Sequence, residues 1–114
     1  MIPGKYNMVC PQGSTFTLDL TYSVNDLPVD LTGYDARMQV REKHSSAEFV
    51  LNIETNTGHI FLNETPGSIR INIPFEMTAL LVAKEYVYDL ELHTPSNVSR
   101  IIEGKFIVTP EVTR

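Results

Sequence analysis

The chain has 114 residues, of which 42% are hydrophobic and 20% are charged, and its formal net charge is −5 at pH 7. This length suits a single domain with one core, and the composition excludes a disordered chain, which is poor in hydrophobic residues. The acidic balance argues against nucleic acid as a partner, and apolar runs of about five residues are far shorter than the roughly 20 that span a bilayer.

Two further features concern the compartment of synthesis. The first five residues, Met-Ile-Pro-Gly-Lys, lack the apolar stretch of a secretory signal. Cys10 is the one cysteine, so no internal disulfide is expected. Both features are typical of a protein made in a reducing cytoplasm.

Alternation of apolar and polar residues predicts strands along most of the chain. A short first strand is expected over residues 6–10, five alternating runs follow, and a last strand is expected over residues 98–108 with a close approach or bulge at Gly104. The apolar positions of the five runs are, in chain order, Phe16, Leu18, Leu20 and Tyr22; Tyr34, Ala36, Met38 and Val40; Phe49, Leu51 and Ile53; Ile69, Ile71 and Ile73; Tyr86, Tyr88, Leu90 and Leu92. One apolar and one polar face per strand favours antiparallel sheets.

One segment breaks the alternation. In residues 74–83, the apolar residues Phe75, Met77, Leu80 and Leu81 are spaced as on a helix, and Pro74 suits the first helical position. The segment predicts a helix of about two turns that plugs the core between strands.

Turn residues separate the strands at about ten-residue spacing, as in a β-sandwich. We therefore expect an all-β, immunoglobulin-like antiparallel sandwich of seven or eight strands with one short helix, forming one domain over residues 1–114. The Cys…Trp…Cys pattern of true immunoglobulin domains is absent, because the chain has no Trp.

No group of residues predicts catalysis, cofactor binding or metal binding. The histidines, His44, His59 and His93, are not at metal-ligand spacing, and no motif of a nucleophile flanks Cys10, which is expected to be a buried, inert thiol. We expect no catalytic, cofactor-binding or metal-binding residues, no cofactor, and no enzymatic activity.

Four carboxylates on or near the last two expected strands are candidates for an acid–base pair. They are Glu85, Asp89, Glu91 and Glu103. Asp89 and Glu91 share one face of a strand, where Arg37, Arg41 or Arg100 can balance them from neighbouring strands. A glycosidase pair needs a cleft that a compact sandwich hardly provides, so surface ion pairs are expected. The two glycosylation sequons, at Asn63 and Asn97, are interpreted as plain polar turns.

An ordered series of phrases carries a resemblance to a known family. The phrases are QGSTF (12–16), PVDLTGY (28–34), ARMQVR (36–41), TAL (78–80), YVYDLEL (86–92), RIIEG (100–104) and PEVTR (110–114). Together they resemble a family of small virion structural proteins, of about 110 residues, that tailed bacteriophages and cyanophages encode. Each phrase alone is also good turn or strand chemistry; the order over nearly the whole chain is what makes the resemblance.

The resemblance implies a non-enzymatic structural subunit that joins other virion proteins in the tail, baseplate or fibre attachment, present as a homo-oligomer or in many copies. It implies assembly in the host bacterial cytoplasm and residence in the virion, with no nucleic-acid or membrane partner. The alternatives are a head or neck decoration protein, and a module at a fibre that binds a host receptor or carbohydrate. Without Trp, an aromatic platform for sugar stacking is less expected. Residues 1–6 and 109–114 are the candidate docking segments.

Overall fold

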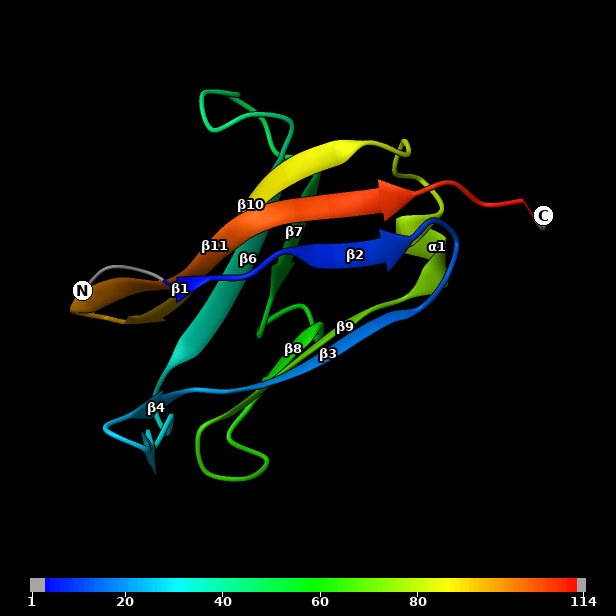
Figure 1. Ribbon diagram of the computed structural model, residues 1–114. Helices are drawn as coiled ribbons and strands as arrows, with labels where there is room; N and C mark the ends of the chain where they lie inside the picture. The colour runs from blue at the N-terminus through cyan, green and yellow to red at the C-terminus, as the bar shows by residue number, and fades with distance from the viewer. Residues whose placement is uncertain (1–3, 113–114) are drawn as a thin grey trace.

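The computed structural model describes residues 4–112 and consists almost entirely of strands, with one short helix (Figure 1). The strands are β1 (Gly4–Lys5), β2 (Met8–Pro11), β3 (Phe16–Thr21), β4 (Ser23–Val24), β5 (Leu27–Pro28), β6 (Asp35–Arg41), β7 (Leu51–Glu54), β8 (Ile60–Leu62), β9 (Ser68–Ile73), β10 (Glu85–Thr94) and β11 (Asn97–Thr109). The all-β prediction is confirmed. Three of the eleven strands, β1, β4 and β5, have two residues each and account for the excess over the expected seven or eight.

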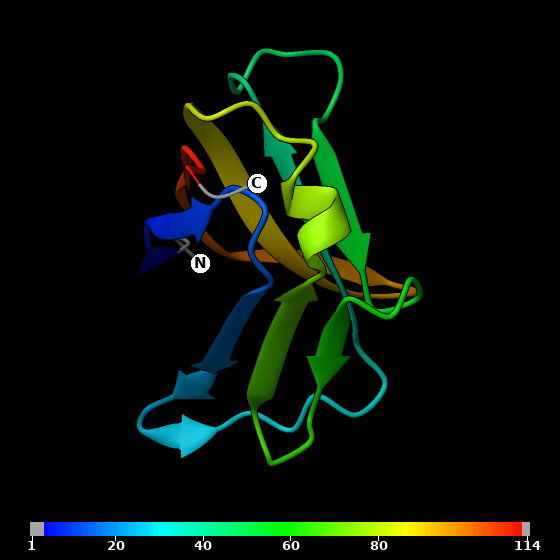
Figure 2. The ribbon, with the colours of Figure 1, turned by 90° about the vertical axis from the view of Figure 1, so that its right-hand side faces the viewer.

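The strands form two facing sheets (Figure 2). A six-stranded sheet has the order β1-β11-β10-β6-β7, with β2 also paired to β11, and a three-stranded sheet has the order β3-β9-β8. The chain crosses between the sheets after β2, between β3 and β6, after β7, and between β9 and β10, and these crossings close the sandwich. The hairpin of β4 and β5 projects from the end away from the helix (Figure 1).

The predicted alternation sets the register of the large sheet. In the antiparallel pair of β10 and β6, Leu90 lies opposite Met38 and Tyr88 lies opposite Val40, and all four side chains are buried. Phe16 of the small sheet meets Phe106 of the large sheet edge to face, with ring centroids 5.7 Å apart. Burying these apolar side chains drives folding and joins the two layers into one core.

The prediction of antiparallel sheets is wrong at one edge. Both β1 and β2 run parallel to β11, with Gly4 opposite Ile102 and Met8 opposite Phe106. The turn after Pro11 sends the chain to the other sheet, so the first strand does not form a hairpin and instead covers the free edge of the last strand. The expected close approach at Gly104 is present, because a Cβ there would lie 2.3 Å from the Tyr6 carbonyl oxygen.

The helix is shorter than predicted. The segment 74–83 was expected to be helical throughout, but α1 spans only Phe75–Thr78, four residues. Beyond it, two carbonyl oxygens accept side-chain hydrogen bonds from distant elements: Leu81 from Gln12 Nε2 at 2.7 Å, and Val82 from the Tyr86 hydroxyl at 2.8 Å. These bonds hold residues 81–82 as an irregular connection to β10. The described helix is too short to cross a bilayer.

The strand expected from Phe49 begins two residues later, at Leu51. Phe49 and Val50 are instead exposed in the loop that connects β6 to β7. The Val50 amide still bonds to the Val40 carbonyl oxygen at 2.7 Å, whereas Arg41 donates to the Ser46 carbonyl oxygen and curls the preceding loop back. The loop therefore carries its two apolar side chains outside the core.

Candidate functional site

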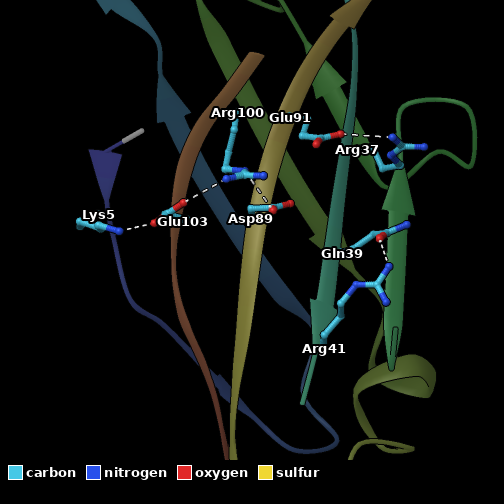
Figure 3. Close-up of polar contacts among 8 residues, drawn as sticks. All are labelled: Lys5, Arg37, Gln39, Arg41, Asp89, Glu91, Arg100 and Glu103. Carbon is cyan, nitrogen blue, oxygen red and sulfur yellow. Dashed lines mark hydrogen bonds and ion pairs between the residues drawn. The ribbon is translucent and has the colours of Figure 1, made fainter. Parts of the chain in front are cut away.

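The outer surface of the large sheet carries a group of charged and polar side chains that we call the charged face (Figure 3). Its members are Lys5, Arg37, Gln39, Arg41, Asp89, Glu91, Arg100 and Glu103. They come from β1, β6, β10 and β11, which are successive neighbours in the large sheet. In β6 and β10 these residues occupy positions that alternate with the buried ones, as period-two patterning requires. In β11, Arg100 and Glu103 are three residues apart, because the register with β10 shifts between them.

Ion pairs across strands organise the charged face. Arg100 Nε lies 3.2 Å from Asp89 Oδ2, and Arg100 Nη1 lies 3.7 Å from Glu103 Oε1. The Glu103 carboxylate also forms an ion pair with Lys5. Arg37 Nη2 lies 3.2 Å from Glu91 Oε1. The expected pairing of Asp89 and Glu91 with arginines is thus confirmed. Since these pairs face solvent, each contributes little to stability.

Arg41 is placed differently from the other two arginines. Its guanidinium donates to Gln39 Oε1 at 2.8 Å and to the Ser46 carbonyl oxygen at 3.0 Å. Its function in the structure is therefore to hold the β6–β7 loop against the sheet. Gln39 and Lys5 were not expected among these ion pairs, because only the strand order brings them to this face.

The charged face is hollowed between β6, β10 and β11, with a volume of about 380 Å³. Burial raises the pKa of Asp89 above its usual value in spite of the neighbouring Arg100. Lys5, by contrast, donates a hydrogen bond to the Glu103 carboxylate and so lowers the pKa of Glu103. The hollow therefore offers balanced hydrogen-bond donors and acceptors that already satisfy one another.

The remaining carboxylate and the thiol are placed apart from this hollow. Glu85 pairs with Lys105 at 3.2 Å on the neighbouring strand. Cys10 is fully buried in β2, and burial raises its pKa to about 11, which keeps the thiol protonated and unreactive at neutral pH.

The three histidines are not brought together. His44 lies in the β6–β7 loop beside the charged face, His59 lies between β7 and β8, where its Nδ1 is 2.9 Å from Thr57 Oγ1, and His93 lies on β10. Within residues 4–112, no group of three or more His, Cys, Asp or Glu side chains is placed to hold a metal ion.

The sequon asparagines lie in turns. Asn63 has a positive φ of 63°, and its Oδ1 accepts hydrogen bonds from the amides of Leu31 and Gly67. Asn97 begins β11 after the turn from β10 and is exposed. Asn63 therefore acts as a turn-stabilising side chain that ties two loops together.

The candidate docking segments, residues 1–6 and 109–114, are only partly described, since residues 1–3 and 113–114 lie outside the described range. Gly4, Lys5 and Tyr6 are exposed yet bonded to the edge of β11, with the Tyr6 amide donating to the Glu103 carbonyl oxygen. At the other end, the Glu111 amide donates to Gln12 Oε1. Whether these segments dock onto a partner stays a prediction.

A second surface, which sequence reasoning missed, lies between α1 and the β6–β7 loop. We call it the apolar hollow. It has a volume of about 500 Å³ and is lined by Glu42, Val50, Leu51, Met77, Leu80, Leu81, Val82, Lys84 and Tyr86. The segment around α1 was expected to plug the core, yet Leu80 is 84% exposed and Val82 is 67% exposed. Only Thr78 and Leu81 of this region are turned inward and buried.

Comparisons with known proteins bear on the fold. No protein-family model and no curated protein matches the chain. Among solved structures, the N-terminal domain of phage TP901-1 ORF48 matches 95% of this chain and 90% of its own, with a TM-score of 0.60 and 8% identity. An endo-beta-1,4-mannanase from Thermotoga petrophila matches 96% of this chain with a TM-score of 0.55 and 14% identity, and this chain spans only 18% of its length. At these identities the likenesses establish a shared fold.

Proposed function

We propose that the chain is a non-enzymatic structural subunit of a tailed-phage particle, and that it joins other virion proteins at the tail, the baseplate or the fibre attachment. In this proposal the protein is synthesised in the host bacterial cytoplasm and is built into the virion in several copies. Its working parts are surfaces that other subunits cover.

The observation that carries the proposal is the likeness to the phage TP901-1 domain. That likeness covers nearly all of both chains, so the two share a whole domain. The mannanase likeness is weaker support for an enzyme, because it involves less than a fifth of that protein. The ordered phrases in the sequence lead independently to virion proteins of tailed phages. Fold alone does not assign function, so the proposal rests on the agreement of these two lines.

The surfaces of the domain also favour a subunit that binds other proteins. Carboxylates and arginines of the charged face form ion pairs with one another, as the contacts of Arg37 and Arg100 show. The apolar hollow, in contrast, leaves Leu80 and Val82 in water. Exposed apolar side chains gathered at one place typically mark a protein–protein interface.

Deletion of the gene tests the proposal. The gene is removed from the phage or prophage genome that encodes it, and the particles are examined by electron microscopy after infection or induction. We expect incomplete tails or tails without fibres, and full rescue by the wild-type gene supplied on a plasmid. Normal particles with normal infectivity in the deletion strain would contradict a role in virion assembly.

A further inference from the structure

The small sheet leaves one long edge open. Its order is β3-β9-β8, and within residues 4–112 no strand pairs with the side of β3 that faces away from β9 (Figure 2). In the large sheet, by contrast, β1 and β2 pair with β11 and cover it. The first strands of the chain therefore protect β11 and leave β3 without a partner on this side, which we call the open edge.

The strand pairing shows which backbone groups lie on the open edge. In β9 the Asn72 amide donates to the His59 carbonyl oxygen on the β8 side, so the isoleucines, which alternate with Asn72, face β3. These isoleucines lie opposite the apolar residues of β3. The N–H and C=O groups that point away from β9 are therefore those of the polar residues Thr17, Asp19 and Thr21.

The open edge lacks the features that usually keep a strand edge from pairing. Natural edge strands are typically short, or they carry Pro, Lys or a bulge. β3 has six residues with neither Pro nor Lys, and its register with β9 is continuous. The other strands at sheet edges are shorter: β7 has four residues, β8 has three, and β2 has four and ends at Pro11. Among the described strands, β3 is thus the most accessible to an added strand.

The side chains of β3 indicate what kind of strand fits. Leu18 and Leu20 pack against the core but are only half-buried, because no strand lies beyond them. Apolar side chains on an added strand would cover these two leucines. The alternate side chains of that strand are polar, because they share the exposed outer face of the sheet with those of Thr17, Asp19 and Thr21.

The outer face of the small sheet has an excess of negative charge. Asp19 and Arg70 are the only charged residues in β3, β8 and β9, and they form an ion pair at 2.8 Å. Arg70 also lies 3.7 Å from Glu64 Oε1, so one guanidinium group is shared by two carboxylates. The β4–β5 hairpin that continues β3 adds Asp26 and no cation. A cationic side chain opposite Asp19 is therefore favoured.

A second copy of β3 is a poor match for the open edge. Antiparallel pairing of two β3 strands through all three open positions sets Asp19 opposite Asp19 of the other copy. Like charges directly opposite each other destabilise a strand pair, and each chain has a net charge of −5. These charges favour a strand from a different protein.

We infer that the open edge of β3 binds an extended segment of another protein as an added antiparallel strand. Its apolar side chains cover Leu18 and Leu20, and a cationic side chain lies opposite Asp19. Antiparallel pairing continues the pattern of the small sheet. The inference goes beyond the proposed function and does not rest on it, because the isolated chain is enough to test it.

A synthetic peptide tests the inference on the full chain. The peptide is Val-Thr-Val-Lys-Val-Thr-Val with a Lys-Lys tail for solubility, and binding to the isotope-labelled chain is followed by NMR. We expect the amides of Thr17, Asp19 and Thr21 to shift and to become protected from hydrogen exchange, with a dissociation constant below about 1 mM. The amides of Leu18 and Leu20 face β9, so they are expected to be protected already in the free chain.

Two N-methylated peptides are the matched controls. In the expected pairing, the Thr and central Lys residues of the peptide present their N–H groups to β3, whereas the N–H groups of the valines between them point away. N-methylation of those Thr and Lys residues is expected to weaken binding at least about tenfold, because the bonds to β3 are lost. N-methylation of an equal number of valines is expected to change binding by less than about threefold.

Variants of the chain test the same contacts from the other side. Thr21→Pro removes an N–H that faces the open edge and none that bonds to β9, so it is expected to fold and to bind the peptide at least about tenfold more weakly. Thr21→Val keeps the N–H and is expected to bind like the wild type. Asp19→Lys is expected to weaken binding about fivefold and to favour a peptide with Glu in place of the central Lys. Circular dichroism checks the fold of each variant.

Two results overturn the inference: amides of Thr17, Asp19 and Thr21 that do not change at about millimolar peptide, or equal binding of the two N-methylated peptides. Protection of these amides without peptide, lost on dilution, assigns the open edge to a second copy and overturns it as well. The proposed function is tested separately, because a chain that is absent from particles can still bind the peptide, and a chain that is present in tails can fail to bind it.

Discussion

The hydroxyl of Tyr88 donates a hydrogen bond of 2.5 Å to the carbonyl oxygen of Tyr6, 82 residues earlier in the chain. Tyr88 lies on β10 and Tyr6 lies at the junction of β1 and β2, so the bond passes beneath β11, which separates them in the sheet. Gly104 leaves the room that this requires, since any side chain there would collide with the same carbonyl. The bond fixes the edge of the large sheet at the point where β1 gives way to β2.

Removing this hydroxyl should loosen the edge of the sheet. We expect Tyr88→Phe to lower the free energy of unfolding by about 1 kcal/mol, because the Tyr6 carbonyl loses its buried donor while the ring still fills its place. Urea unfolding followed by circular dichroism measures the loss. Tyr34→Phe is the control, because the Tyr34 hydroxyl makes no hydrogen bond within residues 4–112; an equal loss in both variants contradicts the assignment.

Gln12 is expected to hold two distant segments at once. Its Nε2 donates to the Leu81 carbonyl oxygen at 2.7 Å, and its Oε1 accepts from the Glu111 amide at 3.2 Å. We expect Gln12→Ala to lower the free energy of unfolding by about 1–2 kcal/mol and to raise amide hydrogen exchange at residues 80–84 and 111–112. Exchange measured by mass spectrometry should stay unchanged in β6 and β10. Uniformly faster exchange throughout the chain would mean that Gln12 has no such local role.

Two glycines with nearly the same backbone angle should differ in their tolerance of alanine. Gly58 has φ +80° with open space around it, and Gly67 has φ +79° but a Cβ there would lie 2.7 Å from the Tyr22 carbonyl oxygen. We expect Gly58→Ala to lose about 1 kcal/mol from the backbone angle alone and Gly67→Ala to lose clearly more. Thermal unfolding of the two variants compares the losses directly, and equal losses would show that the close approach costs nothing.

Two carboxyls of the charged face should respond to pH in opposite directions. Burial raises the pKa of Asp89 above its ordinary 3.8, so its stabilising contribution is present at low pH and is lost as pH rises. Lys5 lowers the pKa of Glu103 below its ordinary 4.5, so that contribution is present above pH 4.5 and is lost as pH falls.

Asp89→Asn and Glu103→Gln separate these effects, because each variant keeps the neutral form at every pH. Relative to the wild type, we expect Asp89→Asn to gain stability and Glu103→Gln to lose it as pH rises from about 3 to 6. Urea midpoints at several pH values measure both trends. Parallel trends for the two variants would contradict the assigned surroundings of at least one carboxyl.

The sequence predicted the parts of this structure that depend on local pattern. Period-two alternation located the buried faces of β6, β9 and β10, as Met38, Ile71 and Leu90 show. It did so because successive side chains of a strand point to opposite faces of the sheet. The sequence therefore predicted which face of each of these strands is buried, without predicting which strands pair with each other. The outward face followed, and with it the likelihood that Asp89 and Glu91 meet arginines.

The rest depends on contacts between residues that are distant in the chain. Helical spacing did not reveal that the helix ends at Thr78, or that Gln12, 69 residues away, binds the Leu81 carbonyl oxygen in the connection that follows. Alternation did not reveal that β1 and β2 run parallel to β11. Nor did helical spacing reveal the exposure of Leu80, since the sequence pattern is the same for an apolar side chain that is buried and for one that stays exposed.

The most direct test of the central claim is to measure the chain in particles. Virions are purified from cells that carry the gene, heads and tails are separated, and quantitative mass spectrometry gives the copies of this chain per particle in each fraction. A structural subunit of the tail, baseplate or fibre attachment is expected in the tail fraction in a fixed, small whole number of copies. Absence of the chain from purified particles would contradict the claim.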